Sequence, residues 1–189
     1  MEVANAVVMA QRFLRPRLTN ADLVLDATVG NGKDTLFLVE NIPSTALAWA
    51  FDIQPQALTN AHELLTKHGV AHKARFVLDS HKHINKYINQ PLDAAMFNLG
   101  YLPGGDHTIS THPDSTIQAL IHALHLLRAG GIITIAAYPG YEHGRLECHA
   151  IQEYLTGLNQ KQITVACWSI VNQKNTPPVL YIIEKMGSE

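Results

Sequence analysis

Short apolar runs alternate with longer segments of helical periodicity along most of the chain. Compact apolar runs bounded by turn residues predict strands, and apolar residues at three- and four-residue steps predict amphipathic helices. The expected strands of this part are 22–27, 46–53, 74–79, 92–100 and 132–139. The expected helices are 33–42, 56–69, a short one at 81–89, 114–131 and 144–158. Because strands separated by helices form parallel βαβ units, the pattern predicts a doubly wound α/β fold.

The C-terminal part breaks this rhythm. Segments 162–171 and 179–185 both have the pattern of strands, and only "NQKNTPP" lies between them. A parallel crossover needs about a dozen residues or more, usually with a helix. The last strand should therefore run antiparallel to its predecessor or insert beside it. A mostly parallel, seven-stranded sheet with an antiparallel last strand is the plan of class I methyltransferases, whereas a nicotinamide-binding Rossmann domain would continue with parallel strands.

Composition narrows the class of protein. The chain has 189 residues, of which 47% are hydrophobic and 16% charged, which suits one globular domain over residues 1–189. The formal net charge of -2 and the pI of about 6.6 argue against a generally basic nucleic-acid-binding protein, so any RNA contact must be a local patch. The candidates for such a patch, unless they are ordinary solvated charges, are Arg12, Arg15, Arg17, Lys73, Arg75, Lys82 and Lys86.

The compartment follows from the N-terminal segment and the cysteines. Glu2 precedes the first apolar run and arginines follow it, unlike a secretory signal, and no apolar run is long enough to span a membrane. Cys148 and Cys167 are too few for a disulfide framework and indicate a reducing compartment, with both expected as inert core residues. We therefore predict a cytoplasmic protein with no membrane partner.

The loop "DATVGNGKDT", residues 26–35, follows the first strand and invites a phosphate-binding interpretation. A triphosphate-binding loop would need glycine where Ala27 stands and a hydroxyl residue where Asp34 follows Lys33. A dinucleotide fingerprint would need a third glycine where Thr35 stands. Asp26 and Asp34 would also repel phosphate oxygens. Negative charge instead suits a ligand with an ammonium and a sulfonium group, which describes S-adenosylmethionine (SAM).

Aspartates end three consecutive predicted strands, at the edge where open α/β sheets bind ligands. Asp52 is placed to accept hydrogen bonds from ribose hydroxyls, and Asp79 from the adenine amino group, with His81 and Ile53 packing nearby. The alternative is that each aspartate caps the following helix. The predicted cofactor site, for SAM and its product S-adenosylhomocysteine, comprises Asp26, Thr28, Gly30, Asn31, Gly32, Asp34, Thr35, Asp52, Ile53, Gln54, Asp79, Ser80, His81, Asn98 and Gly100.

The segment "FNLGYLPGG", residues 97–105, follows the fourth predicted strand. Asn98 and Tyr101 have the [DN]-x-x-[YF] spacing of methyltransferases that act on amino groups, and we predict them as the catalytic residues. The Asn98 oxygen can accept the hydrogens of a neutral amine and aim its lone pair at the methyl carbon, and an aspartate there would also accept them. Tyr101 can stack on a base or face the developing positive charge. The alternative is a plain turn, since Asn, Gly and Pro all favour turns.

These motifs together carry a family resemblance over nearly the whole chain. With "DATVGNGKDTLFL", "FDIQPQAL", "FNLGYLPGGD" and "NQKNTPPVLYIIEK", the chain resembles the YtqB/MnmM-type family, long labelled rRNA methylases. The resemblance implies a SAM-dependent tRNA methyltransferase that converts 5-aminomethyl-2-thiouridine at the wobble position to its methylaminomethyl form. It also implies the tRNA anticodon stem-loop as partner and leaves a homodimer open. Two departures are Thr28, where class I enzymes usually have glycine, and Tyr141, where the family usually has histidine and this chain has one only at His143.

The loops after the fourth and fifth strands form the predicted substrate site. Its residues are Tyr101, Leu102, Pro103, Gly104, His112, Tyr138, Pro139, Gly140 and Tyr141. Other functions stay open at this point: methylation of rRNA or of a small amine, a nicotinamide-dependent oxidoreductase, and a SAM-binding module without catalysis. The 11 histidines suggest a metal site as a further hypothesis, but their spacing matches no zinc motif, so we predict no metal.

Overall fold

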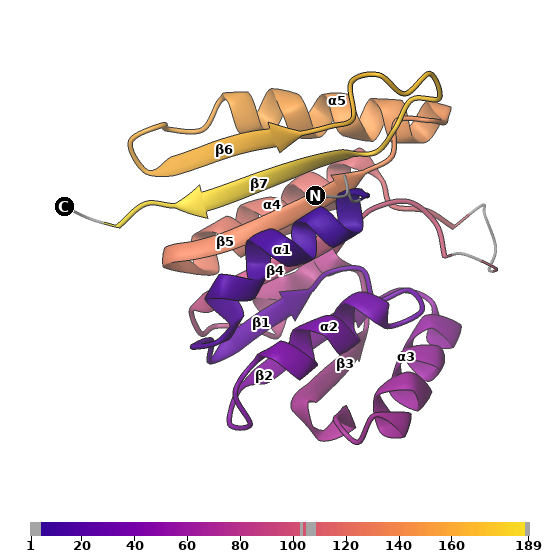
Figure 1. Ribbon diagram of the computed structural model, residues 1–189, viewed down its shortest axis with the longest axis vertical. Helices are drawn as coiled ribbons and strands as arrows, with labels where there is room; N and C mark the ends of the chain where they lie inside the picture. The colour runs from indigo at the N-terminus through magenta and orange to yellow at the C-terminus, as the bar shows by residue number, and fades with distance from the viewer. Residues whose placement is uncertain (1–4, 103, 105–108, 188–189) are drawn as a thin grey trace.

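The computed structural model describes residues 5–102, 104 and 109–187. Within them, seven strands form one sheet in the order β3-β2-β1-β4-β5-β7-β6 (Figure 1). The strands are β1 Leu23–Asp26, β2 Leu47–Asp52, β3 Ala74–Leu78, β4 Leu92–Asn98, β5 Leu127–Ala137, β6 Ile163–Trp168 and β7 Val179–Lys185. β1 to β5 pair in parallel, and β7 lies between β5 and β6, antiparallel to both. The predicted class I methyltransferase plan is confirmed, and the short "NQKNTPP" connection explains the antiparallel insertion.

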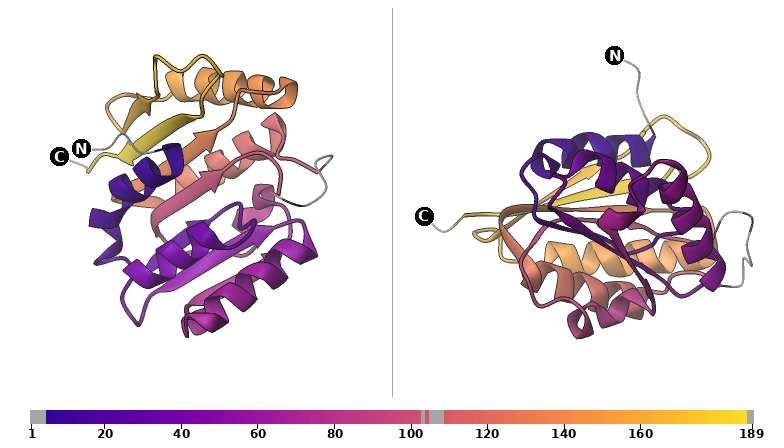
Figure 2. Two further views of the ribbon diagram at one scale, coloured as in Figure 1. Left: turned by 45° about the vertical axis from the view of Figure 1, so that its right-hand side comes forward. Right: turned by 90° about the horizontal axis from the view of Figure 1, so that it is seen from below.

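Helices cover both faces of the sheet (Figure 2). They are α1 Ala6–Leu18, α2 Lys33–Asn41, α3 Pro55–Lys67, α4 Pro113–Leu126 and α5 Glu142–Thr156, with the short 3-10 helices η1 Ala71–Lys73 and η2 His81–Lys86. Alternate strand residues divide the core between the faces: Phe97 packs on the side of α4 and α5, and Met96 on the side of α1 and α2. None of the described helices is long and apolar enough to cross a membrane.

Helix α1 was not expected from the sequence. Ala6, Ala10, Leu14 and Leu18 are buried at four-residue steps, so the helix buries one stripe against the sheet. Its N-terminus is capped by Asn5, whose side chain accepts a hydrogen bond from the backbone of Val8 at 2.9 Å. The apolar residues at four-residue steps were the signal in the sequence that indicates this helix.

The predicted helix 114–131 is too long. The helix ends at Leu126, and β5 begins at Leu127, which pairs with Leu92 of β4. Arg128 then forms an ion pair with buried Asp93 at 2.5 Å. The helical periodicity continues to Gly130 and Gly131, but strand pairing and this ion pair place the residues after Leu126 in β5.

Cys167, expected in the core, is exposed, while Cys148 is half-buried. Because β7 inserts beside β5, β6 becomes the edge strand of the sheet, and Cys167 lies on that strand. The prediction failed because it treated β6 as a covered strand.

Candidate active site

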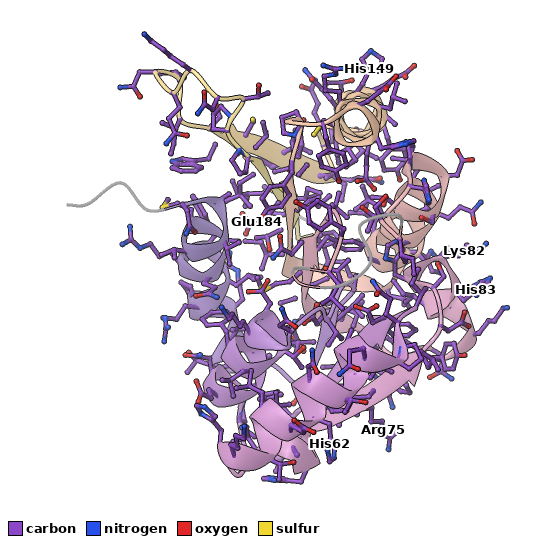
Figure 3. All side chains as sticks on the ribbon, turned by 90° about the vertical axis from the view of Figure 1, so that its right-hand side faces the viewer. His62, Arg75, Lys82, His83, His149 and Glu184 are labelled. Atoms are coloured by element: carbon purple, nitrogen blue, oxygen red, sulfur yellow. The ribbon has the colours of Figure 1, made fainter. Side chains whose placement is uncertain are left out.

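A cavity of about 910 Å³ opens at the edge where the parallel strands end. Figure 3 looks onto this edge, with Lys82 and His83 labelled on η2 at one flank. The loops after β1, β2, β3, β4 and β5 all contribute to its wall. The predicted residues that line it are Thr28, Gly30, Asn31, Asp34, Asp52, Ile53, Gln54, Asp79, Ser80, His81, Asn98, Gly100, Tyr101, Leu102, His112, Tyr138, Gly140 and Tyr141. The structure thus brings both halves of the predicted site to one cavity, as expected for the carboxyl edge of an open α/β sheet.

Some predicted residues do not line this cavity: Asp26, Gly32, Thr35, Gly104 and Pro139. Pro103 lies outside the described residues. Asp26 is fully buried, and its carboxylate accepts hydrogen bonds from the Thr35 hydroxyl at 2.5 Å and the Thr28 backbone N–H at 3.1 Å. Burial, together with the nearby charge of Asp34, raises the pKa of Asp26 to about 7. Asp26 and Thr35 therefore support the loop from beneath rather than face a ligand.

Gly32 serves the packing of two helices. It precedes α2 with a φ of +78°, a left-handed conformation that favours glycine. A Cβ at this position would lie 2.6 Å from Ala61 of α3, closer than atoms can approach. Gly32, predicted as part of the cofactor site, therefore lets α2 approach α3.

Asp52 ties together the loops after β1 and β2. Its two carboxylate oxygens accept hydrogen bonds from the backbone N–H groups of Gly30 and Gln54, both at 2.9 Å. An ionised carboxylate offers about four acceptor positions, so each oxygen can accept a further donor. Asp52 is thus fixed in place at the cavity wall with acceptor capacity left.

Asp79 has hydrogen-bond partners that the sequence did not predict. One oxygen accepts from His83 Nδ1 at 2.9 Å and from the Ser80 backbone at 2.7 Å, and the other accepts from the Tyr87 hydroxyl at 2.9 Å. The His83 hydrogen bond, the largest cause, lowers the pKa of Asp79 below its ordinary value. The i, i+4 spacing from Asp79 to His83 was the available signal for this pair.

His81 is buried at the cavity wall, and its Nδ1 lies 3.1 Å from the carbonyl oxygen of Ala27. Burial lowers the pKa of His81 to about 4, so the ring is neutral at pH 7 and donates from Nδ1. No group of three His, Cys, Asp or Glu side chains able to hold a metal occurs in the part of the chain that the structure describes.

Asn98 lies at the centre of a hydrogen-bonded chain that joins three elements. Its backbone N–H donates to the Thr28 hydroxyl at 2.7 Å, and its side-chain Nδ2 donates to Asp34 Oδ2 at 3.1 Å. The Tyr138 hydroxyl donates to Asn98 Oδ1 at 2.9 Å. Asp34 is 6% exposed, and burial raises its pKa. The amide is therefore fixed in one orientation, and Oδ1 retains one acceptor position.

Two tyrosine rings stand at the part of the cavity wall predicted to bind substrate. Tyr101 is 43% exposed, and its ring centroid lies 6.1 Å from that of Tyr141, edge to face. Gly100 has a φ of +120°, and a Cβ there would lie 3.4 Å from the Tyr141 hydroxyl. Tyr141 thus packs over the segment that carries Tyr101.

A buried acid anchors that same segment, and sequence reasoning missed it. Glu147 of α5 is 2% exposed and accepts hydrogen bonds from the Thr111 hydroxyl at 2.7 Å and the Thr116 hydroxyl at 2.6 Å. Thr111 accepts in turn from the Gly100 backbone N–H at 2.9 Å. Nothing in the local spacing of Glu147 indicates this role, because its partners come from two other segments.

Several of the proposed RNA-binding cations have partners within the protein. Arg17 pairs with Glu184, Lys73 donates to the carbonyl groups of Val39 and Ile42, and Arg75 lies over the Trp49 ring. Of the seven candidates, Lys82 alone lines the cavity. The RNA-facing patch stays a prediction, with Lys82 its best-placed member.

Comparison with known proteins identifies the family. Residues 48–184 match the family model described as "Putative rRNA methylase". The chain belongs to the rRNA methylase family. A crystal structure of a Clostridium thermocellum protein with the same description is 40% identical, with a TM-score of 0.96 over 98% of this chain and 100% of that chain. A Streptococcus mutans methyltransferase, solved in complex with S-adenosylhomocysteine (SAH), is 36% identical, with a TM-score of 0.90 over 98% and 100%.

A third relative is named after a specific tRNA methylation. The chloroplastic tRNA (mnm(5)s(2)U34)-methyltransferase of Arabidopsis thaliana is 28% identical over 179 residues, which cover 89% of this chain. The chain spans 65% of the length of that plant protein. Family and fold together make this member of the rRNA methylase family a methyltransferase, in agreement with the sequence prediction and against the oxidoreductase alternative.

Proposed function

We propose that the chain transfers the methyl group of SAM to the primary amine of 5-aminomethyl-2-thiouridine at the tRNA wobble position. The observation that carries the proposal is the fixed Asn98 amide, with its oxygen held at the cavity wall and Tyr101 beside it. The name of the plant relative supports the substrate, and the SAH complex of the Streptococcus mutans relative supports the cofactor. The cavity of about 910 Å³ is at the large end for small-molecule sites, as a cofactor and a nucleoside together require.

The cofactor occupies the half of the cavity formed by the loops after β1, β2 and β3. Asp52 accepts the ribose hydroxyls through its remaining acceptor positions. Ile53, 52% exposed at the cavity wall, covers one face of the adenine, and Asp79 and Ser80 lie at its polar edge. The loop of Thr28 to Asn31 lies beside the methionine portion.

The reaction needs orientation rather than a metal. The amine nitrogen forms a bond to the methyl carbon while the carbon–sulfur bond breaks, and its electrons stay on sulfur to give SAH. The amine must arrive neutral, and after transfer the nitrogen releases a proton to solvent. The free acceptor position of Asn98 Oδ1 binds an amine hydrogen and so directs the lone pair toward the methyl carbon. Tyr101 stacks on the thiouridine ring, and its π face favours the positive charge that develops on nitrogen.

The family description favours a second substrate, rRNA. Both substrates can be tested in one experiment: purified protein and SAM are incubated with tRNA carrying unmethylated 5-aminomethyl-2-thiouridine and, separately, with unmodified rRNA. Nucleoside mass spectrometry then identifies the product. We expect the thiouridine to gain the mass of one methylene, about 14 mass units, and rRNA to gain none. Methylation of rRNA alone would overturn the tRNA assignment, and Asn98→Ala serves as the inactive control.

The anticodon stem-loop as binding site, a homodimer and a cytoplasmic location remain predictions. The first is tested by comparing the methylation rate of an isolated stem-loop with that of full-length tRNA.

A further inference from the structure

Helix α1 brings a polar side chain, Gln11, to the candidate active site. Its neighbour Ala10 is buried against the sheet, together with Leu14 one turn later. Gln11 is half-buried, and its Nε2 donates a hydrogen bond to Asp34 Oδ1 at 3.3 Å. An unexpected helix thus reaches the carboxylate that holds the Asn98 amide.

Asp34 receives a hydrogen bond on each of its two oxygens. Gln11 donates to one and Asn98 to the other. Burial raises the pKa of Asp34, and these two hydrogen bonds, with Gln11 the larger, oppose that rise. Lys33 on the same helix also lowers the pKa of Asp34, and the charge of Asp34 in turn raises the pKa of Asp26 at the end of β1 and of Tyr138 after β5. Gln11 therefore favours the ionised form of Asp34.

The ionised form of Asp34 determines how Asn98 is oriented. A carboxylate only accepts hydrogen bonds, so it selects the NH2 group of Asn98 and leaves Oδ1 toward the Tyr138 hydroxyl. A protonated Asp34 would also donate, and the amide could then turn over and present NH2 where the substrate amine needs an acceptor. Loss of the Asp34 charge would thus disorder the acceptor position.

We infer that Gln11 is a positioning residue for methyl transfer, acting through Asp34 to hold the Asn98 oxygen toward the substrate amine. The inference rests on the proposed function for its catalytic consequence, while the chain of contacts from Gln11 to Asn98 can be measured without it.

The kinetic test compares Gln11→Met, which keeps the length of the side chain and removes the donor, with Gln11→Glu, which faces Asp34 with a second carboxylate. The control is Gln152→Met on the exposed side of α5. We expect Gln11→Met to lower kcat about tenfold at the acidic end of the pH range, as loss of a hydrogen bond to a charged group does, with SAM affinity within about twofold. The deficit should shrink as pH rises, because Asp34 ionises again. Gln11→Glu should show a larger deficit that persists to higher pH.

A merely structural role of Gln11 predicts a different pattern. It would lower kcat by the same factor at every pH and lower the melting temperature in proportion, and that result would overturn the inference. An unchanged kcat at every pH in Gln11→Met would overturn it too.

Spectroscopy separates this inference from the proposed function. The side-chain NH2 signals of Asn98 in nitrogen-labelled protein, assigned by their loss in Asn98→Ala, should titrate with Asp34. In Gln11→Met the midpoint of this titration should move to higher pH. If the parent methylates no tRNA, the proposed function fails and the spectra still decide the contact chain. An unmoved midpoint overturns the role of Gln11 even if methylation of tRNA is demonstrated.

Discussion

Replacing Asn98 by aspartate tests the contact on which the orientation of the acceptor site depends. In the parent protein, Asn98 Nδ2 donates to Asp34 Oδ2 at 3.1 Å. Asn98→Asp removes the donor and leaves two carboxylates facing each other at about that distance. Two unit charges about 3.1 Å apart repel by ~5 kcal/mol at an effective dielectric constant of ~20. The sequence alone suggested that aspartate would serve here as another acceptor, but the contact with Asp34 reverses that expectation.

The repulsion has a defined pH dependence. It acts when both carboxylates are ionised, so the pair holds one proton more tightly and the pKa of that pair rises. A raised pKa in the folded state means that protonation stabilises the fold at low pH and that this stability is lost as pH rises. The melting temperature of Asn98→Asp should therefore lie furthest below that of the parent at alkaline pH. We expect kcat to fall roughly ten- to hundredfold, because a misplaced orienting group costs about that much.

Thermal melts across pH, initial rates at saturating SAM and calorimetric SAM affinity provide the assay. Asn98→Ala is the uncharged control, and the exchange Asp34→Asn with Asn98→Asp restores one amide and one carboxylate. The exchanged pair should recover much of the stability that the single Asn98→Asp loses. Parental melting temperatures for Asn98→Asp at every pH would refute the contact between residues 34 and 98, and with it the orientation argument.

Three further predictions concern the cofactor, the substrate and stability. Asp52→Ala should weaken SAM binding by about 1–3 kcal/mol, measured by calorimetry with NAD as the ligand that should not bind; unchanged SAM affinity would remove Asp52 from the site. Tyr101→Ala should lower kcat/KM for tRNA by the equivalent of roughly 1–3 kcal/mol of lost base stacking, whereas Tyr101→Phe should keep a kcat/KM near that of the parent. Equal losses in the two variants would argue against stacking. Asp26→Asn should change the melting temperature little at low pH. As pH rises through about 7, the melting temperature of Asp26→Asn should rise above that of the parent, because the parent loses the stabilising proton of buried Asp26 over that window.

The fold could be predicted because its determinants are local and repeated. Apolar runs separated by helical segments specify parallel strands. Because "NQKNTPP" is too short for a crossover, the antiparallel pairing of β6 and β7 followed from the length of that connection, whereas the place of β7 between β5 and β6 did not. The end of α4 could not be predicted in the same way. It depends on Leu127 pairing with Leu92 and on Arg128 meeting Asp93, which lie far away in sequence.

The candidate site likewise contains residues that the sequence predicts and residues that it does not. Residues after strand ends, such as Asp52 and Asn98, were identifiable because the carboxyl edge of the sheet gathers them into one cavity. The residues that hold them were not. Gln11 reaches Asp34 from 23 positions away, and Glu147 holds Thr111 from 36 positions away, and neither pairing leaves a spacing motif.

The acids of the loop after β1 present less negative charge to a ligand than the sequence alone suggests. Asp26 and Asp34 were counted as negative charge facing the ligand, yet Asp26 is fully buried with a pKa of about 7, and Asp34 already accepts hydrogen bonds from Gln11 and Asn98. Asp52 remains as a strand-end carboxylate at the cavity wall, where it accepts hydrogen bonds from the backbone N–H groups of Gly30 and Gln54. The loop after β1 departs from a dinucleotide fingerprint at Thr35, which stands where the third glycine is needed, more than through the charge of its acids. Its acids act mainly on the protein itself, and Asp34 acts on the Asn98 amide.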